Sequence, residues 1–259
     1  MNNTTIKRVL ITGASRGIGK AIALEYAKRN YTLTLLARNT DELKKTVERI
    51  NYQKPDSAFY HQCDVTNKES VREAIEFASR SMGGIDIAIL NAGINRKNIG
   101  ANYSFSETLE EIFHTNVFGM MYCIENILPL MKQKGEGTIA GVGSLSDFRG
   151  APGFGIYNTS KIAVSYLLES LRIENLDTGV KIINIRPGFI STDMVSDFKF
   201  KMPFLMNPER AAKIIVEGID KQKSVIAFPL PVRIGSLLLK MLPSFIYEKG
   251  SDYFINKYK

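Results

Sequence analysis

The 259-residue sequence contains no tryptophan, only two histidines and only two cysteines. Cys63 and Cys123 allow one disulfide at most, and neither belongs to a C-x-x-C pair. No cluster of histidine, cysteine and acidic residues has the spacing of a metal site, so we expect no bound metal. So few cysteines are typical of a reducing compartment, and we expect a cytoplasmic protein.

Long hydrophobic runs are also missing. The first apolar run, at 9–12, is too short for the core of a signal peptide. The hydrophobic stretch at 225–247 is interrupted by Pro229, Pro231 and Pro243 and by two basic residues, so we expect no transmembrane segment. The formal charge is 34 − 26 = +8, but lysine and arginine are spread along the chain. Because nucleic-acid binding needs a concentrated basic face, we expect no nucleic-acid partner.

Short hydrophobic runs alternate with longer helical patterns along most of the chain. The predicted strands are 8–12, 33–37, 58–62, 85–90, 138–142, 181–186 and 225–228. The predicted helices are 18–30, 41–51, 68–81, 106–132, 156–177 and a last one that starts at Asn207-Pro208 and runs to about 222. This alternation predicts an α/β fold of the Rossmann type, with a doubly wound parallel sheet of about seven strands and helices on both faces. We expect one domain over 1–259, with a loop region at 190–206 and a helical C-terminal extension at 229–259.

The first predicted strand leads into a glycine-rich turn, TGASRGIG at 12–19. Glycines at this place allow a tight turn and let backbone N–H groups approach a phosphate, although an ordinary strand–helix turn is the alternative. The second predicted strand ends at Arg38, where an acidic residue would select NAD by binding the ribose hydroxyl. Arg38 and Arg16 could instead bind a 2′-phosphate, which favours NADP, unless Arg38 is only a solvated charge.

Tyr157 and Lys161 are four residues apart in a predicted helix, so their side chains share one face. A free phenol has a pKa near 10, and a neighbouring ammonium favours the phenolate. The pair could therefore transfer a proton to or from a substrate oxygen at neutral pH.

These motifs together resemble the short-chain dehydrogenase/reductase family, in its short single-domain branch, over residues 6 to about 228. The matching segments are 12–19, Asp64-Val65, Asn91-Ala92-Gly93, Asn116, Ser144 (thirteen residues before Tyr157) and Pro187-Gly188. The resemblance implies that the catalytic residues are Asn116, Ser144, Tyr157 and Lys161. It implies cofactor contacts at Gly13, Ser15, Arg16, Gly17, Ile18, Gly19, Arg38, Asp64, Val65, Asn91, Ala92, Gly93, Tyr157, Lys161, Pro187, Gly188, Ile190 and Thr192.

The resemblance also implies a mechanism. Hydride passes between NADP(H) and the carbon of a carbonyl or secondary alcohol, while Tyr157 acts as the acid/base. Ser144 binds the substrate oxygen, with Ser146 as a weaker substitute. Lys161 lowers the pKa of Tyr157 and holds the ribose, and Asn116 organises a water in a proton relay. A homodimer or homotetramer is implied.

The chain departs from the family after the last strand, where about 30 further residues follow instead of a short end. We expect this tail and the Phe- and Met-rich region at 190–206 to cover an apolar substrate, a lipophilic ketone or aldehyde. A dimer contact, a shallow membrane contact and an added core-covering helix remain alternatives, since Leu237, Leu238, Met241, Leu242, Phe245 and Ile246 could share one helical face. A 3-oxoacyl thioester reductase and a catalytically silent NADP sensor or scaffold are the alternative functions.

Overall fold

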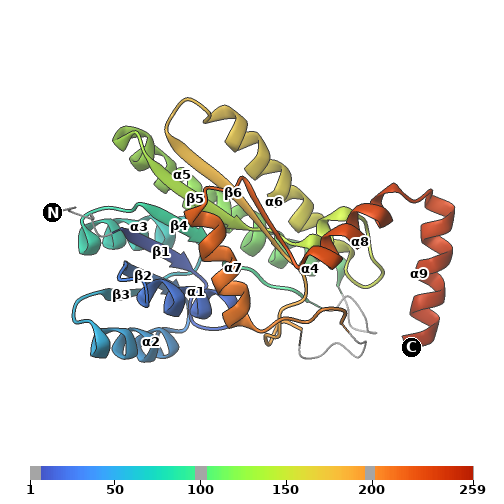
Figure 1. Cartoon of the computed structure of the whole chain (residues 1–259), viewed down its shortest axis with the longest axis horizontal. Helices are drawn as coiled ribbons and strands as arrows, with labels where there is room; N and C mark the ends of the chain where they lie inside the picture. Colours follow the sequence, from blue (N-terminus) through green and yellow to red (C-terminus); the bar gives the residue numbers. More distant parts are fainter. Residues whose placement is uncertain (1–6, 97–103, 196–201, 259) are drawn as a thin grey trace.

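The computed structural model describes residues 7–96, 104–195 and 202–258, with side chains of the last helix as far as 252. Seven parallel strands form one sheet in the order β3-β2-β1-β4-β5-β6-β7 (Figure 1). The strands are β1 (Arg8–Thr12), β2 (Thr32–Ala37), β3 (Ala58–Gln62), β4 (Ile87–Leu90), β5 (Gly137–Val142), β6 (Val180–Pro187) and β7 (Val225–Phe228). The predicted fold class is therefore confirmed. Each predicted strand overlaps an observed one, with ends that differ by no more than two residues.

Helices cover both faces of the sheet (Figure 1). They are α1 (Gly17–Ala27), α2 (Thr40–Gln53), α3 (Lys68–Met82), α4 (Phe105–Phe113), α5 (Gly119–Lys134), α6 (Gly155–Glu174), α7 (Pro208–Asp220), α8 (Leu230–Met241) and α9 (Ser244–Tyr258). One hydrophobic cluster joins α1, α2 and α7 to the sheet, and a second joins α3, α5 and α6 to its other face. Strands buried on both sides explain the continuous hydrophobic runs in the sequence.

The predicted start of α7 is confirmed in detail. Asn207 accepts a hydrogen bond from the backbone N–H of Arg210 at 2.9 Å, and Pro208 occupies the first turn. The predicted helix over 106–132 is observed as α4 and α5, which continue into one another through a π-helical turn at His114–Phe118. Such a turn adds a residue to the helical repeat and so changes the direction of the side chains that follow.

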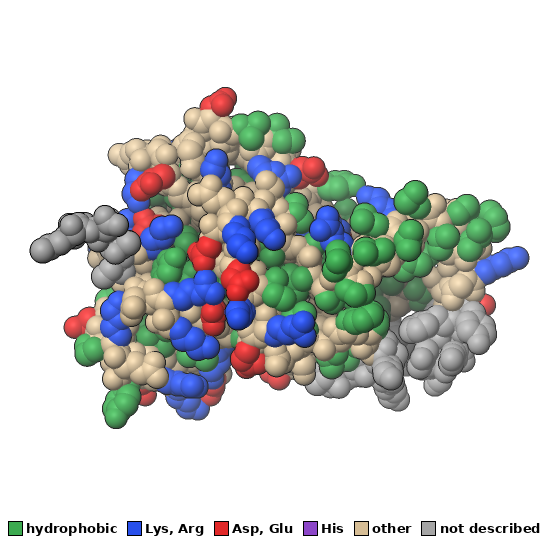
Figure 2. Space-filling model, in the orientation of Figure 1, with side chains coloured by type: hydrophobic (Ala, Val, Ile, Leu, Met, Phe, Trp, Pro, Cys, Tyr) green, Lys and Arg blue, Asp and Glu red, His purple; other side chains and the backbone are tan. Residues whose placement is uncertain are grey.

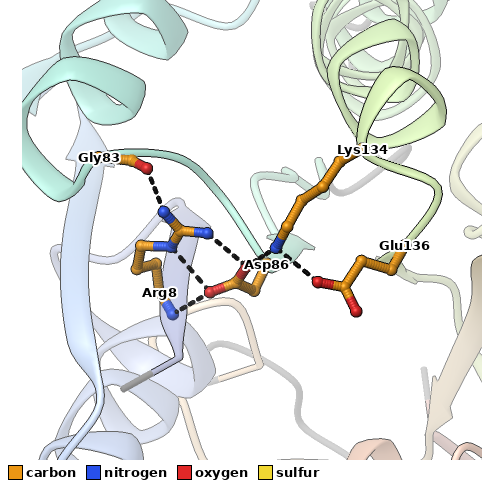
Figure 3. Close-up of polar contacts among 5 residues, drawn as sticks. All are labelled: Arg8, Gly83, Asp86, Lys134 and Glu136. Carbon is orange, nitrogen blue, oxygen red and sulfur yellow. Dashed lines mark hydrogen bonds and ion pairs between the residues drawn. The ribbon is translucent and has the colours of Figure 1, made fainter. Parts of the chain in front are cut away.

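Charged side chains are paired at the amino end of the sheet (Figure 3). Arg8, at the start of β1, binds Asp86 through its side chain at 2.7 and 2.9 Å, and also the backbone carbonyl of Gly83. Lys134, at the end of α5, contacts Asp86 at 2.6 Å and Glu136 at 2.8 Å. This network ties the first strand to the loop before β4 and to the end of α5.

The C-terminal extension is helical, and α8 packs against a 3₁₀ turn at Leu145–Phe148. Arg149 holds the junction between α8 and α9 by donating to the backbone oxygens of Leu239 and Leu242. Its guanidinium also lies 4.4 Å from the ring centroid of Tyr247.

The expected single helical face of six apolar residues is only partly present. Leu237, Leu238 and Met241 are exposed on α8, but the helix ends at Leu242-Pro243, and Phe245 and Ile246 belong to α9. Proline cannot continue the α8 hydrogen-bond pattern, which explains the break.

Candidate active site

The site lies at the carboxyl ends of the neighbouring strands β1 and β4. The chain continues from β1 toward one edge of the sheet and from β4 toward the other edge. Asn91, directly after β4, joins the two ends. Its side-chain amide donates to the backbone oxygens of Thr12 and Gly13, each at 3.1 Å. The hydroxyl of Thr12 accepts hydrogen bonds from the backbone N–H groups of Asn91 and Ala92. Asn91 and Ala92 therefore shape the turn that follows β1.

Three glycines in this turn are required by its geometry. Gly13 and Gly17 have φ angles of +65° and +57°, which favour glycine. A Cβ on Gly19 would lie 2.4 Å from the backbone oxygen of Gly13. Helix α1 begins here with no side-chain cap and with no acidic residue in its first turn. Its first N–H groups are therefore suited to a phosphate, which fits the dinucleotide predicted from the sequence.

Arg16 and Arg38 are both exposed near the ends of β1 and β2. The guanidinium of Arg16 contacts the carboxylate of Asp193 at 3.0 Å, across 177 residues of sequence. The sequence analysis did not identify this contact. Because both side chains are largely exposed, this ion pair is weak.

The other expected nucleotide contacts surround the same edge of the sheet. One side-chain oxygen of Asp64 accepts hydrogen bonds from the N–H and hydroxyl of Thr66, and Val65 is buried against Gly119. A Cβ on Gly17 would lie 3.2 Å from Cγ2 of Thr192, so the loop after β6 faces the glycine turn.

The loop after β6 is held at both of its ends. Gly188 donates its backbone N–H to the oxygen of Phe228 at 2.7 Å, and Ile190 is buried and bridged to Met206. The middle of the predicted loop region, 196–201, lies outside the described residues.

Ser144, Tyr157 and Lys161 converge between the end of β5 and the start of α6. The ammonium of Lys161 is buried, donates to the backbone oxygen of Val142 at 2.9 Å and lies 5.7 Å from the Tyr157 ring centroid. Ser144 is also buried, and its hydroxyl accepts hydrogen bonds from both the N–H and the hydroxyl of Ser146. Ser146 is thus a partner that orients Ser144.

Burial controls the pKa values of the pair. It raises the pKa of Tyr157 to about 12, opposed by a hydrogen bond with Ser144. It also lowers the pKa of Lys161 to about 8. Burial is the main cause of both shifts, and the Lys161 ammonium is bound to the backbone oxygen of Val142.

Asn116 lies in the π-helical turn and is fully buried. Its side chain accepts from the N–H of Ile94 at 2.8 Å and donates to the Ile94 oxygen and the Ser160 hydroxyl, both at 3.0 Å. A Cβ on Gly93 would lie 3.2 Å from the Asn116 side-chain oxygen and 3.5 Å from the Lys161 ammonium. Asn116 therefore joins the loop after β4 to helix α6, beside the catalytic candidates.

The sequence analysis missed Asp147, three residues after Ser144. Its carboxylate is nearly inaccessible to solvent, pairs with Arg186 and accepts a 2.5 Å hydrogen bond from Ser165. Its negative charge raises the pKa values of both Tyr157 and Lys161, although burial has the larger effect on each. Spacing alone could not reveal this carboxylate, since its partners lie 39 and 18 residues away.

A hollow of about 330 Å³ lies between the segment after the 3₁₀ turn and helix α9. Its lining residues are Gly150, Ala151, Pro152, Tyr247, Glu248, Ser251 and Asp252. Helix α9 thus forms one wall of this hollow and contributes two acidic side chains to it, and its lining includes none of Ser144, Tyr157 and Lys161.

Comparisons with known proteins agree with this geometry. The family model described as short chain dehydrogenase matches residues 7–202. An uncharacterized oxidoreductase of Myxococcus xanthus is 29% identical over 97% of this chain and 98% of the relative. Ketoacyl reductase HetN of Nostoc sp. is 32% identical over 90% of this chain and 82% of the relative.

A solved structure shows the same arrangement. An alcohol dehydrogenase from the archaeon Thermococcus sibiricus, complexed with 5-hydroxy-NADP, superposes with a TM-score of 0.75. It is 30% identical, and the match covers 86% of this chain and 94% of that one. With the family model matching most of the sequence and the motifs assembled at one edge of the sheet, the chain belongs to the short-chain dehydrogenase/reductase family, whose members are oxidoreductases that use a nicotinamide cofactor.

Proposed function

We propose that this oxidoreductase uses NADP(H) to interconvert a carbonyl compound and a secondary alcohol, and that it acts mainly as a reductase of a lipophilic ketone or aldehyde. The observation that carries the proposal is the convergence of Ser144, Tyr157 and Lys161 beside the glycine turn after β1. This arrangement supplies a proton donor, a second hydrogen-bond donor and a positive charge within one site.

A bound nicotinamide supplies or accepts the hydride. In the reductive direction the Tyr157 hydroxyl gives its proton to the substrate oxygen, and its pKa of about 12 keeps that proton in place at neutral pH. Ser144, oriented by Ser146, donates a second hydrogen bond to the same oxygen. Lys161 stabilises the phenolate left after transfer and holds the ribose, while Asn116 fixes the loop of Gly93 and organises a proton relay.

The preference for NADP rests on Arg16 and Arg38. Both guanidiniums are exposed beside the turn, and two forked donors suit a 2′-phosphate. Asp193 competes for Arg16, so Arg38 carries more of the discrimination in this proposal. The remaining nucleotide contacts are those assigned in the sequence analysis.

We also propose one domain over 1–259, a cytoplasmic location and a homodimer or homotetramer. Among the residues the structure describes, no helix is both long and apolar enough to cross a bilayer. Helix α8 packs against the 3₁₀ turn that directly follows Ser144, which supports a role of the C-terminal extension in substrate selection.

A 3-oxoacyl thioester reductase is the second candidate. The similarity to the Nostoc ketoacyl reductase favours it. The extension after β7 supports a different substrate, because its helix α8 packs on the 3₁₀ turn that follows Ser144. A silent NADP sensor is a weaker alternative, since a sensor has no need of the buried Ser144–Tyr157–Lys161 cluster.

The test combines nucleotide binding with turnover. NADPH and NADH are titrated separately by fluorescence, and NADPH consumption is followed with aliphatic, aromatic and steroid ketones and with a 3-oxoacyl thioester. We expect NADPH to bind at least about tenfold more tightly than NADH, because of the 2′-phosphate contacts. Arg38→Leu should remove most of that difference and leave NADH binding unchanged.

Equal binding of the two nucleotides by the unmodified protein would overturn the NADP assignment. Turnover of the thioester alone would favour the second candidate function. Tight NADPH binding with no turnover of any carbonyl would favour the sensor.

A further inference from the structure

Helix α8 is oriented with its small residues toward the protein and its large apolar residues toward solvent. Ser236 is buried, and its hydroxyl donates to the backbone oxygen of Val232 at 2.8 Å. The same hydroxyl approaches the backbone oxygen of Leu145 in the 3₁₀ turn, at 3.5 Å. An ordinary surface helix has the reverse orientation, with its apolar stripe on the core.

The outward side of α8 forms a continuous apolar face. Its members are Leu230, Ile234, Leu237, Leu238 and Met241, which are 61%, 49%, 52%, 61% and 81% exposed. Their spacing of 4, 7, 8 and 11 residues from Leu230 places them on one side of an α-helix. Figure 2 shows hydrophobic side chains gathered over α8 on the face in view. Five large apolar side chains in contact with water at one place require an explanation.

Basic residues border this apolar face of α8. Arg233 and Lys240 are exposed on the same helix, which contains no acidic residue. The whole segment 229–259 has five Lys and Arg against two Asp and Glu, a net charge of +3. An apolar face with a basic border complements a bilayer that carries anionic headgroups.

The helix is fixed to the functional part of the molecule. Arg149 binds its C-terminal end, as described above, and at its N-terminal end a Cβ on Gly188 would lie 3.5 Å from Cγ1 of Val232. Gly188 belongs to the loop expected to contact the nucleotide, and the 3₁₀ turn under α8 directly follows Ser144. A surface that bound the α8 face would therefore lie next to the active site.

The size of the face favours a membrane over a second protein copy. A helix of 12 residues is about 18 Å long and about 10 Å across, so its outer strip offers roughly 200 Å². A stable protein interface buries about 800 Å² on each partner. A bilayer needs only the apolar side of one helix, which lies in the plane of the headgroups.

We propose that the outward face of α8 docks this protein on the surface of an anionic lipid membrane. The helix lies along the headgroups, with Leu237 and Met241 inserted and Arg233 and Lys240 against the phosphates. Docking brings the 3₁₀ turn after Ser144, on which α8 packs, close to the bilayer, which is where a lipophilic carbonyl substrate would be dissolved. That last consequence rests on the proposed function, whereas the docking itself does not.

The test measures binding of the full chain to vesicles by flotation, without turnover, so its failure is distinct from a failure of the proposed reaction. The probes are vesicles of phosphatidylcholine and vesicles that also contain about 30% phosphatidylglycerol. We expect at least about tenfold stronger binding to the anionic vesicles, and at least about a tenfold loss in the Leu237→Gln/Met241→Gln double variant. Arg233→Gln/Lys240→Gln should remove the preference for anionic vesicles.

Tyr52→Gln/Leu176→Gln is the matched control, because it removes two exposed apolar side chains from α2 and from the end of α6. Circular dichroism confirms that each variant is folded before it is used. Unchanged vesicle binding in the Leu237→Gln/Met241→Gln variant, or an equal loss in the control, would overturn the proposal. If light scattering showed that the α8 variant forms a smaller oligomer than the unmodified protein, the proposal would also be overturned, because the face would then join two copies of the chain.

Discussion

The charged side chains at the two ends of the parallel sheet differ in their partners and in their burial. At the amino end, the cations Arg8 and Lys134 each contact the carboxylate of Asp86 within 3 Å, close to solvent (Figure 3). At the carboxyl end, Lys161 is buried and its ammonium donates to the backbone oxygen of Val142, and no carboxylate among the described residues pairs with it. Charges at the amino end are thus paired with one another, whereas at the carboxyl end the paired Asp147 and Arg186 lie beside a buried ammonium that is bound only to a backbone oxygen among its described contacts.

The difference appears in the direction of the pKa shifts. Burial alone would raise the pKa of Asp86, but hydrogen bonds from Arg8 and Lys134 hold it well below its usual value, so the folded state favours the ion. Burial raises the pKa of Tyr157 and lowers the pKa of Lys161, so it favours the neutral form of each side chain. The ion pairs of Asp86 stabilise the fold at one end of the strands. The two groups that take part in the proposed proton transfer, Tyr157 and Lys161, lie at the other end.

The largest effect is expected from Tyr157→Phe, which removes the proton donor and little else. We expect kcat to fall about a thousandfold, which is within the range of general acid catalysis. NADPH binding and the free energy of unfolding should change little. Steady-state kinetics, fluorescence titration and urea unfolding measure the three quantities. Tyr166→Phe is the matched control on the same helix, because Tyr166 is largely exposed, and it should keep full activity.

Asp86→Ala should lower the stability of the protein and leave its turnover nearly unchanged. It leaves Arg8 and Lys134 without their shared carboxylate, and we expect the free energy of unfolding to fall by about 2 kcal/mol. We expect kcat to stay within about twofold, because the change is at the far end of the sheet. Glu76→Ala removes an exposed partner of Arg72 and should leave the free energy of unfolding almost unchanged, because solvent screens this pair.

The decrease in the free energy of unfolding caused by Asp86→Ala should also depend on pH. A carboxyl whose pKa is depressed in the folded state stabilises the fold above its unfolded pKa of about 3.9, and this contribution is lost as the pH falls. The stability difference between the two proteins should therefore narrow as the pH is lowered below about 4. A difference that stayed constant down to acid unfolding would contradict the assigned ion pair.

A smaller effect is expected from Asp147→Asn. This change tests whether a charge outside the predicted site residues alters the pKa values of Tyr157 and Lys161. The negative charge of Asp147 raises the pKa values of Tyr157 and Lys161, so its removal should lower both. Reduction needs both groups protonated, and the loss of kcat/KM at high pH should therefore begin at a pH lower by about one unit. Asp177→Asn, an exposed change at the end of α6, is the control and should leave the pH profile unchanged. A uniform loss of rate with no shift of the profile would show that Asp147 is only structural.

The sequence predicted the parts of the molecule that depend on local pattern. Strands buried on both faces appear as short hydrophobic runs, and the cap at Asn207-Pro208 has a local signature. The spacing of Tyr157 and Lys161 likewise depends only on the helical repeat.

Features that depend on contacts between distant segments could not be predicted in this way. The π-helical turn at Asn116 is stabilised by Ile94 and Ser160, which lie 22 and 44 residues away. The pairing of Arg16 with Asp193 joins residues 177 apart. The hydrophobic pattern of α8 showed that one face is apolar, but only packing against the 3₁₀ turn determines that this face points outward.

The most direct test of the division between the two ends measures kcat and the free energy of unfolding for Tyr157→Phe and Asp86→Ala in parallel. We predict a crossed result, in which Tyr157→Phe loses turnover and keeps its stability while Asp86→Ala loses stability and keeps its turnover. If Tyr157→Phe still turned over a carbonyl substrate at the normal rate, or if Asp86→Ala lost turnover at full stability, the account would be wrong.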